Sequence, residues 1–522
     1  MRTLQDRAAE GAVEFQFVLG SSYRTEVCGK SDSVLAMKWL RRAAEQGHDI
    51  AQFFLGDMFR LGLGVPKDMR LAAGWYMKAA EQGEVGAQFM LGLLFEDGIG
   101  VLKDPQQAFK WYLKAAEQGH ADAQFFVATL YGAGTGVLKD ESEAAGWYLK
   151  AAEQGHASAQ FNLALAYDNG KGVPKDERQA VGWYLKAAEQ GDAKAQFNLA
   201  FSYANGTGGL QDDEQAAGWF RKAAEQGHAS AQLRLALAYD YGTGVPKDER
   251  QAVGWYLKAA KQGNAIAQFN LALSYAKGTG VLRDDKQAAA WYLKAAEQGH
   301  ASAQFNLALA SDNGKGVPKD ESQAAGWYLK AAEQGHGSAQ FNLANAYDNG
   351  KGVPRDEVQA AGWYLKAAEQ GHSSAQHNLG NMYVHGTGVP KDERQAAGWF
   401  RKAADQGNVA SQNNLGAMYE YGVGVRQDHA EAVRWYELAA RQGAAWSQRG
   451  LGLMLRDGKG SSRDLIQAHA WLNLAGAADK PHPDAAAERD ALARLLTPPQ
   501  LADAQRLARD WKLGAAMGTP RL

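Results

Sequence analysis

Cysteine is nearly absent from this chain, and several other signals are missing with it. Cys28 is the only cysteine among 522 residues, so no disulfide can form within the chain, as in a protein of a reducing compartment. No apolar run approaches the roughly 20 residues of a membrane-spanning helix, so we expect no integral membrane segment. The formal net charge of −2 gives no overall attraction for nucleic acid or acidic lipid, and we expect no nucleic-acid partner.

The N-terminal residues also lack the layout of a signal peptide. Residues 1–16, MRTLQDRAAEGAVEFQ, contain no basic segment followed by an apolar segment and a small-residue cleavage site. This favours a cytoplasmic location. Residues 4–11, LQDRAAEG, nevertheless resemble the repeat ending LKAAEQG, so the chain begins as if inside a repeat. A signal peptide missing upstream would instead indicate a periplasmic or secreted protein.

What the chain has in abundance is repetition. Tryptophan recurs every 36 residues from Trp39 to Trp471, and a fixed period of this size is typical of proteins that stack one supersecondary unit on the next. We place thirteen repeats of 36 residues in 12–479. Residues 1–11 are interpreted as the remnant of a preceding helix, and 480–522 as C-terminal capping helices.

Each repeat predicts two helices joined by glycine-containing turns. In the repeat that begins at Ala157, the first helix covers about 157–168 and ends at Asn169-Gly170, because glycine takes the left-handed conformation that follows a helix. Asp176 is an expected N-cap of the second helix, and Gln179 gives a variant of the capping box. The pattern A-x-x-W-Y-x-x-A-A then places the apolar residues on one helical stripe.

These motifs carry a resemblance. The pattern A-x-A-Q-x-x-L-[AG]-x-x-Y-x-x-G-x-G-V-x-x-D, followed by W-Y-x-K-A-A-x-x-G, resembles the Sel-one-like repeat, a relative of the tetratricopeptide repeat, over about nine-tenths of the chain. The resemblance implies an all-α fold, a right-handed α/α superhelical solenoid whose first helices line the concave side. Family members are mostly adaptor or scaffold proteins, in endoplasmic-reticulum quality control and in bacterial signalling and host-interaction systems.

The two ends depart from the repeat pattern. Glu26 and Cys28 replace the paired loop glycines of the first repeat. Beyond the last repeat, 483–496 reads as one helix. Thr497, with prolines and a glutamine after it, then predicts the capped start of another helix that reaches about Leu513. An open array of repeats needs such a cap over its last apolar face.

The candidate partner-binding surface follows from the implied concave side. Aromatic, aliphatic and amide side chains recur there at equivalent positions of the first helices, and amides can hydrogen-bond a peptide backbone. The alternative, packing of the rings between repeats, stays open because aromatic stripes at helical spacing are usually buried. The candidate residues are Phe89, Phe125, Phe161, Asn162, Leu165, Asp168, Phe197, Asn198, Phe269, Asn270, Phe305, Asn306, Phe341 and Asn342.

One pair of motifs matches catalytic elements. Ser274-Tyr275-Ala276-Lys277 and Ser311-Asp312-Asn313 fit the S-x-x-K and S-D-N elements of serine β-lactamases and penicillin-binding enzymes. No K-T-G element accompanies them, and the cysteine-stapled relatives linked to penicillin binding differ from this chain. We therefore expect no enzyme, and keep a peptidoglycan-associated or β-lactam-binding protein, including a hydrolase, as an alternative.

Histidine recurs just after the second helix of seven repeats. Equivalent residues of neighbouring helices lie about 8–10 Å apart, too far to share one zinc ion with bonds of about 2 Å. A solvated polar loop is the interpretation, and we expect no metal and no cofactor. The histidines are His48, His120, His156, His228, His300, His336 and His372.

A glycine beside the repeated tryptophan occupies the middle of most second helices. Lys110 and Arg434 stand at the position equivalent to Gly182, so this position must reach solvent. Glycine inside a helix costs about 0.8–1 kcal/mol relative to alanine. We therefore expect alanine at these positions to stabilise the chain.

Taken together, these patterns favour a non-catalytic protein-interaction scaffold or adaptor that binds a peptide or partner domain on its concave face. A structural solenoid that associates with copies of itself is a third alternative. A binding protein would hold its ligand in the groove formed by the first helices, whereas a self-assembling one would hold a second copy there.

Overall fold

The computed structural model describes residues 2–25, 32–209, 211–515 and 517. Within these ranges the secondary structure is helical and contains no strand, which confirms the all-α prediction. The departures predicted at Glu26 and Cys28 lie outside the described residues. The chain divides into two compact halves, Met1–Gln262 and Gly263–Leu522.

The N-terminal half opens with α1 (Arg2–Ala9) and continues with helical pairs. The first helices of the repeats are α2 (Val13–Arg24), α4 (Asp49–Leu61), α6 (Val85–Asp97), α8 (Ala121–Ala133), α10 (Ala157–Asn169), α12 (Ala193–Asn205) and α14 (Ala229–Tyr241). The second helices are α3 (Ser33–Glu45), α5 (Met69–Glu81), α7 (Pro105–Glu117), α9 (Glu141–Glu153), α11 (Glu177–Glu189), α13 (Asp213–Glu225) and α15 (Glu249–Lys261), with a short 3₁₀ turn η1 (Thr207–Gly209) after α12.

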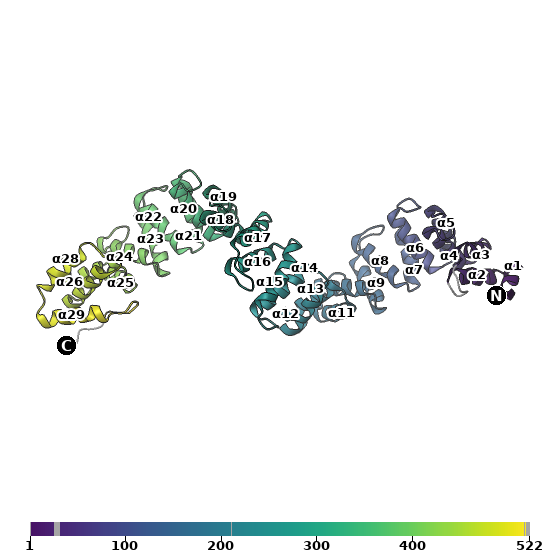
Figure 1. Cartoon of the computed structure of the whole chain (residues 1–522), viewed down its shortest axis with the longest axis horizontal. Coiled ribbons are helices and arrows are strands. Elements are labelled where there is room, and N and C mark those ends of the chain that lie inside the picture. The colour runs from purple at the N-terminus through teal and green to yellow at the C-terminus, as the bar shows by residue number, and fades with distance from the viewer. Residues whose placement is uncertain (1, 26–31, 210, 516, 518–522) are drawn as a thin grey trace. The chain divides into compact units, whose positions relative to one another are not determined.

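The C-terminal half repeats the same arrangement. Its first helices are α16 (Ala265–Lys277), α18 (Ala301–Asn313), α20 (Gly337–Asn349), α22 (Ser373–His385), α24 (Val409–Tyr421) and α26 (Ala445–Asp457). Its second helices are α17 (Asp285–Glu297), α19 (Glu321–Glu333), α21 (Glu357–Glu369), α23 (Glu393–Asp405), α25 (His429–Arg441) and α27 (Leu465–Ala477), followed by α28 (Ala485–Ala493) and α29 (Pro498–Asp510). In each half, a helix packs against the helices before and after it (Figure 1).

The helix ends follow the predicted signals with one exception. The Asp176 carboxylate accepts hydrogen bonds from the backbone N–H groups of Arg178 and Gln179, each at 3.0 Å, and Gly170 ends α10 with φ +66°. The capping box is not formed. The backbone N–H of Asp176 donates instead to the Tyr167 carbonyl at 2.9 Å, so the Gln179 side chain has no donor to satisfy there.

The predicted stripe of alanine and aromatic residues forms the core. Ala187 and Ala188 are buried where α11 meets its neighbours, and Trp183 and Tyr184 of the same helix are buried beside them. The ammonium of Lys186 lies 3.8 Å from the centre of the Trp183 ring, a cation–π contact that covers the remaining edge. Small residues therefore set the distance between helices, and large rings fill the space between repeats.

A buried glutamine on most first helices links three successive helices. The Gln160 side-chain amide donates to the Ala152 carbonyl on α9 at 3.0 Å, and its oxygen accepts from the Gln190 side chain at the end of α11 at 2.7 Å. Such pairing is required because a buried amide without partners is costly. The same two bonds are made by Gln16, Gln52, Gln88, Gln124, Gln196, Gln232, Gln304, Gln340, Gln376 and Gln412.

After the last repeat, α28 and α29 pack against α27. Trp471 is buried there and meets Trp511 edge to face at 5.6 Å. The backbone N–H of Thr497 donates to Gln500 at 3.0 Å, as the capping motif predicts. The helix α29 ends at Asp510, short of the predicted Leu513, because Trp511 adopts an extended conformation and its indole N–H donates to the Ala515 carbonyl at 2.9 Å.

Candidate functional site

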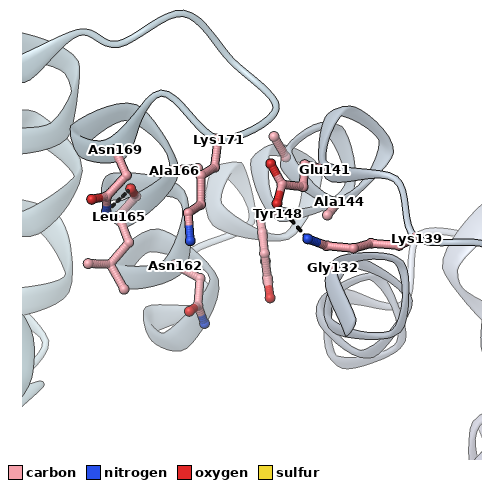
Figure 2. Close-up of a pocket in the computed structure, with 11 residues that line it drawn as sticks. Gly132, Lys139, Glu141, Ala144, Tyr148, Asn162, Leu165, Ala166, Asn169 and Lys171 are labelled. Carbon is pink, nitrogen blue, oxygen red and sulfur yellow. Dashed lines mark hydrogen bonds and ion pairs between the residues drawn. The ribbon is translucent and has the colours of Figure 1, made fainter. Parts of the chain in front are cut away.

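Pockets open on the first-helix face, by which we mean the surface that carries positions equivalent to Asn162, Leu165 and Asn169. The pocket of about 300 Å³ between α8, α9 and α10 has an apolar wall of alanines and Leu165. Tyr148 lies at its side, and Lys171 enters from the loop after α10 (Figure 2). The pocket is thus built from two consecutive repeats.

Equivalent pockets recur at other junctions between repeats. Pockets of about 180, 200 and 300 Å³ lie beside Phe220, Tyr292 and Tyr328. These three residues differ from Tyr148 by whole multiples of 36 positions. The hollow is therefore a property of the repeat and not of one exceptional segment.

The predicted site residues divide into those that line these pockets and those that do not. Asn162, Leu165, Asn306 and Asn342 line them. The Asp168 carboxylate accepts a long hydrogen bond of 3.5 Å from the Tyr184 hydroxyl. Asn198 and Asn270 occupy equivalent positions but line none of these four pockets.

The predicted phenylalanines are half-buried between repeats. Six of them stack on the histidine that precedes the first helix of the next repeat, with ring centres 4.5–4.7 Å apart. These are Phe89, Phe125, Phe197, Phe269, Phe305 and Phe341. At the junction of Phe161 the equivalent position is Asp192, and Phe161 packs beside Tyr184, with ring centres 6.1 Å apart. Each ring thus takes part in packing and retains an exposed edge.

The recurring histidines are not solvated loop residues, so that interpretation is wrong. His156 is the N-cap of α10, and its Nδ1 accepts a hydrogen bond from the backbone N–H of Ala159 at 3.1 Å. One face of its ring stacks on the Phe125 ring, with ring centres 4.7 Å apart. A helix start needs acceptors for its free N–H groups, and neutral imidazole supplies one. Asp192 and Asn264 serve as N-caps at equivalent positions.

Mild acidification should destabilise the chain through these caps. Burial lowers the pKa of His228, His300, His336 and His372 below the ordinary value near 6.5, so protonation favours the unfolded chain. The contribution of these caps to the free energy of unfolding is complete above pH 6.5. It is lost as the pH falls, by up to about 1 kcal/mol for each cap that is lost. Urea unfolding midpoints at pH 7.5 and 5.5 test this.

The matched control replaces all four histidines by asparagine, the cap already present at Asn264. Asparagine does not titrate, so the midpoint of the variant should fall less than that of the parent chain, with the remaining fall due to the other buried histidines His377, His469 and His482, whose pKa burial also lowers. A midpoint of the parent chain that does not fall, or an equal fall in both proteins, contradicts the assignment to these caps.

The serines of the catalytic-looking motifs make ordinary structural hydrogen bonds. The Ser274 hydroxyl donates to the Asn270 carbonyl within α16 at 3.0 Å. Ser311 is fully buried and donates to Gln323 at 2.9 Å. Among the described residues, no group of three or more His, Cys, Asp or Glu side chains is placed to hold a metal ion. No helix in those ranges has both the length and the apolar character to span a membrane.

The residues that sequence reasoning overlooked at this face are the second-helix tyrosines and the loop lysines. The repeat pattern predicts Tyr148 and Tyr292 in the apolar stripe, but each also lines a pocket, together with Lys171 and Lys315 respectively. The sequence signal that could have pointed to these residues is the position equivalent to Asp168, where some repeats have an acidic residue and others a small one.

Comparison with known proteins identifies the repeat. The Sel1 repeat model matches residues 13–48, 49–84, 85–120, 121–156, 157–192, 193–228, 229–264, 265–300, 301–336, 337–372, 373–408, 409–443 and 447–480. A protective antigen of uropathogenic Escherichia coli strains with an SLR fold is 37% identical, with a TM-score of 0.71 and coverage of 91% of this chain and 93% of that one. A Sel1 repeat protein from Oxalobacter formigenes is 34% identical, with a TM-score of 0.48 and coverage of 60% and 94%. No curated protein matches the chain.

Proposed function

Because the chain belongs to the Sel1 repeat family, we propose that it is a non-catalytic scaffold that binds a peptide or a partner domain on its first-helix face, the implied concave side. A Sel1 repeat solenoid fits a protein-interaction scaffold in general terms. We propose more specifically that the partner contacts the first-helix face through the fourteen candidate residues predicted from the sequence.

The observation that carries the proposal is the recurrence of one pocket at whole-repeat intervals. Three of the four pockets combine an apolar wall with amide groups, as at Leu165 and Asn162. Binding sites typically join apolar area to a few placed polar groups, and a row of equivalent pockets suits a ligand that extends along several repeats.

Two alternatives remain as outcomes of experiment. A β-lactam-binding or peptidoglycan-associated protein is disfavoured because Ser311 is fully buried and both motif serines already donate hydrogen bonds. Turnover of nitrocefin that is lost on Ser274→Ala would support it. A solenoid that associates with itself would form dimers or larger species in analytical ultracentrifugation.

Affinity capture from the source organism, followed by quantitative mass spectrometry, tests the proposed face. The variant Leu165→Lys with Leu309→Lys places charge in the walls of three pockets. It should capture at least tenfold less of a protein that the parent chain captures specifically. The control places lysine at Gly182 and Gly326 on the second helices, where a side chain meets nothing within 4 Å and where Lys110 shows lysine to be tolerated.

The control variant should capture the partner as the parent chain does. Equal capture by all three proteins would contradict binding on the first-helix face, and loss only in the control would move the site to the second helices. Thermal unfolding of each variant, followed by circular dichroism, verifies that the captured amounts are compared between folded proteins.

A further inference from the structure

Three of the pockets lie beside repeats that lack an acidic residue at one position. The position equivalent to Asp168 is occupied by Gly132, Ala204 and Ala276, which line the pockets at three junctions spaced 72 residues apart. Two of these pockets, beside Gly132 and Ala276, pair a second-helix tyrosine with a loop lysine. The third has Phe220 and Thr243 at those positions.

Other repeats show what normally occupies this space. The Tyr112 hydroxyl donates to Glu96 at 2.6 Å, and the Tyr256 hydroxyl donates to Asp240 at 3.0 Å. Both acids stand at the position equivalent to Gly132 and Ala276. Several acid-containing repeats therefore place a carboxylate on this tyrosine, although the Tyr328 hydroxyl, in the repeat with Asp312, has no partner among the described residues and Tyr364 donates to Asn345 at 2.6 Å.

Without that acid, the tyrosine hydroxyl has no carboxylate acceptor within its own repeat. Tyr292 is 5% exposed, borders its pocket, and makes no hydrogen bond through its hydroxyl with any described residue. Burial raises its pKa to about 12, so it remains a donor at neutral pH. The Tyr148 hydroxyl pairs with the neutral Thr129 hydroxyl at 3.3 Å. A hydrogen bond to a charged acceptor is worth about 1.5–3 kcal/mol, so a carboxylate arriving from a partner would be a stronger acceptor for either tyrosine than a neutral hydroxyl or water.

A cation stands at the same two pockets. Glu141 and Asp285 also line them, but Glu141 is paired with Lys139 at 2.8 Å and Asp285 with Arg283 at 3.1 Å. Lys171 and its equivalent Lys315 make no ion pair with the described carboxylates. Figure 2 shows Lys171 extending beside Asn162 and across from Tyr148, away from the bonded Lys139 and Glu141.

The position equivalent to Lys171 varies between repeats. It is Thr135 after Glu96 and Thr207 after Asp168, whereas Lys351 follows Asp312. The pockets beside Gly132 and Ala276 are those in which a tyrosine and a lysine meet without that internal acid. The remaining hydrogen of the Asn162 amide, whose other hydrogen is directed at the Ser158 carbonyl at 2.9 Å, adds a neutral donor.

We propose that the two pockets beside Gly132 and Ala276 each bind a side-chain carboxylate of an extended peptide segment in a partner protein, in the place where sister repeats hold their own Asp or Glu. The carboxylate accepts from Tyr148 or Tyr292 and lies against Lys171 or Lys315. This proposal rests on the proposed function, because it specifies what the first-helix face selects in its partner.

Fluorescence anisotropy with two labelled peptides tests the selection for acid. The probe is the dodecapeptide (Glu-Gly-Ser)₄, and its neutral match is (Gln-Gly-Ser)₄. Charge-assisted hydrogen bonds are worth about 1.5–3 kcal/mol, so the glutamate peptide should bind at least about tenfold more tightly. Equal affinity for both peptides would overturn the proposal.

The most direct variant restores the missing acid. Gly132→Asp with Ala276→Asp gives the two tyrosines the internal carboxylate of the sister repeats, and a Cβ at Gly132 has only the Ala144 methyl within 4 Å, at 3.9 Å. This protein should stay folded and lose at least about tenfold in affinity for the glutamate peptide. Gly182→Asp with Gly326→Asp adds the same charge on the second helices and should lose little.

Removal of the cations should weaken binding in the same way. Lys171→Gln with Lys315→Gln should reduce affinity for the glutamate peptide, whereas Lys103→Gln with Lys67→Gln, an equal change of charge away from the pockets, should not. Unchanged binding after either pocket substitution would overturn the proposal. Full displacement of the peptide by equimolar glutarate would also overturn it, in favour of a site for small free acids.

Failure here is distinguishable from failure of the proposed function. If the aspartate variant captures the native partner as well as the parent chain does, while Leu165→Lys with Leu309→Lys does not, the scaffold function stands and carboxylate selection is wrong. Dissociation of a self-associated species by the glutamate peptide would instead identify a second copy of this chain as the occupant, which also contradicts the proposal.

Discussion

Replacing eight second-helix glycines by alanine raises the free energy of unfolding by about 6–8 kcal/mol if the single effects add. Each glycine lies inside a helix, and a methyl group there would meet nothing within 4 Å. The gain therefore comes from the lower conformational entropy of the unfolded chain, with no new strain in the folded one. The positions are Gly74, Gly146, Gly182, Gly218, Gly254, Gly326, Gly362 and Gly398.

Guanidinium unfolding of the eightfold variant and of two single variants measures this gain. Each single substitution should contribute about 0.8–1 kcal/mol. Gly92→Ala is the matched control, because this glycine is also inside a helix but its new methyl group would collide with the Tyr112 ring, so stability should fall. An unchanged midpoint in the eightfold variant would mean that these glycines are not a source of instability.

The second large effect is expected at a loop glycine, Gly172, which approaches the preceding repeat. Its φ of +71° is unfavourable for other residues, and a methyl group there would overlap the backbone carbonyl of Glu141 at the start of α9. Gly172→Ala should destabilise the junction between α9 and α10 by about 2–5 kcal/mol, from left-handed strain and overpacking together. Hydrogen exchange of amides in α9 and α10 reports the loss.

Gly191→Ala separates the two causes. Gly191 has a φ of +93°, but a methyl group there has nothing within 4 Å, so only the backbone strain of about 1–2 kcal/mol remains. Equal losses at Gly172 and Gly191 would show that contact between the repeats contributes nothing.

The repeat frame and most helix ends follow from local sequence. The 36-residue period of Trp183 is visible in the sequence itself. The Asp176 cap and the Gly170 stop depend on neighbours within one turn of chain, and sequence expresses such relations directly. The bonds of Gln160 do not, because its partners Ala152 and Gln190 are 8 and 30 residues away. A buried glutamine in a helix gives no sign of which groups satisfy it.

Only part of the candidate site could be predicted from the sequence, again because its contacts join residues that are far apart in the chain. Asn162 and Leu165 were placed on the pocket face because both belong to the first helix. Tyr148 was assigned to the core, since a tyrosine in an apolar stripe looks the same whether or not an acid meets its hydroxyl. Its repeat has Gly132 where several other repeats have an acidic residue. This difference becomes visible only when the hydrogen bonds of the equivalent tyrosines in those repeats are compared.

The glutamine linkage has a consequence for how such a chain changes length over generations. Most glutamines equivalent to Gln160 bond to residues 8 positions before them and 30 positions after them. If a gene gains or loses 36 codons, or a multiple of 36, the new junction therefore brings matching donors and acceptors together again. The near-identical repeats from 121 to 371 offer ready sites for such recombination. At the last glutamine, Gln448, the side-chain oxygen has no donor, because the residue 30 positions later is Ala478. Growth by duplication is therefore tolerated within the array and is unsupported beyond this end.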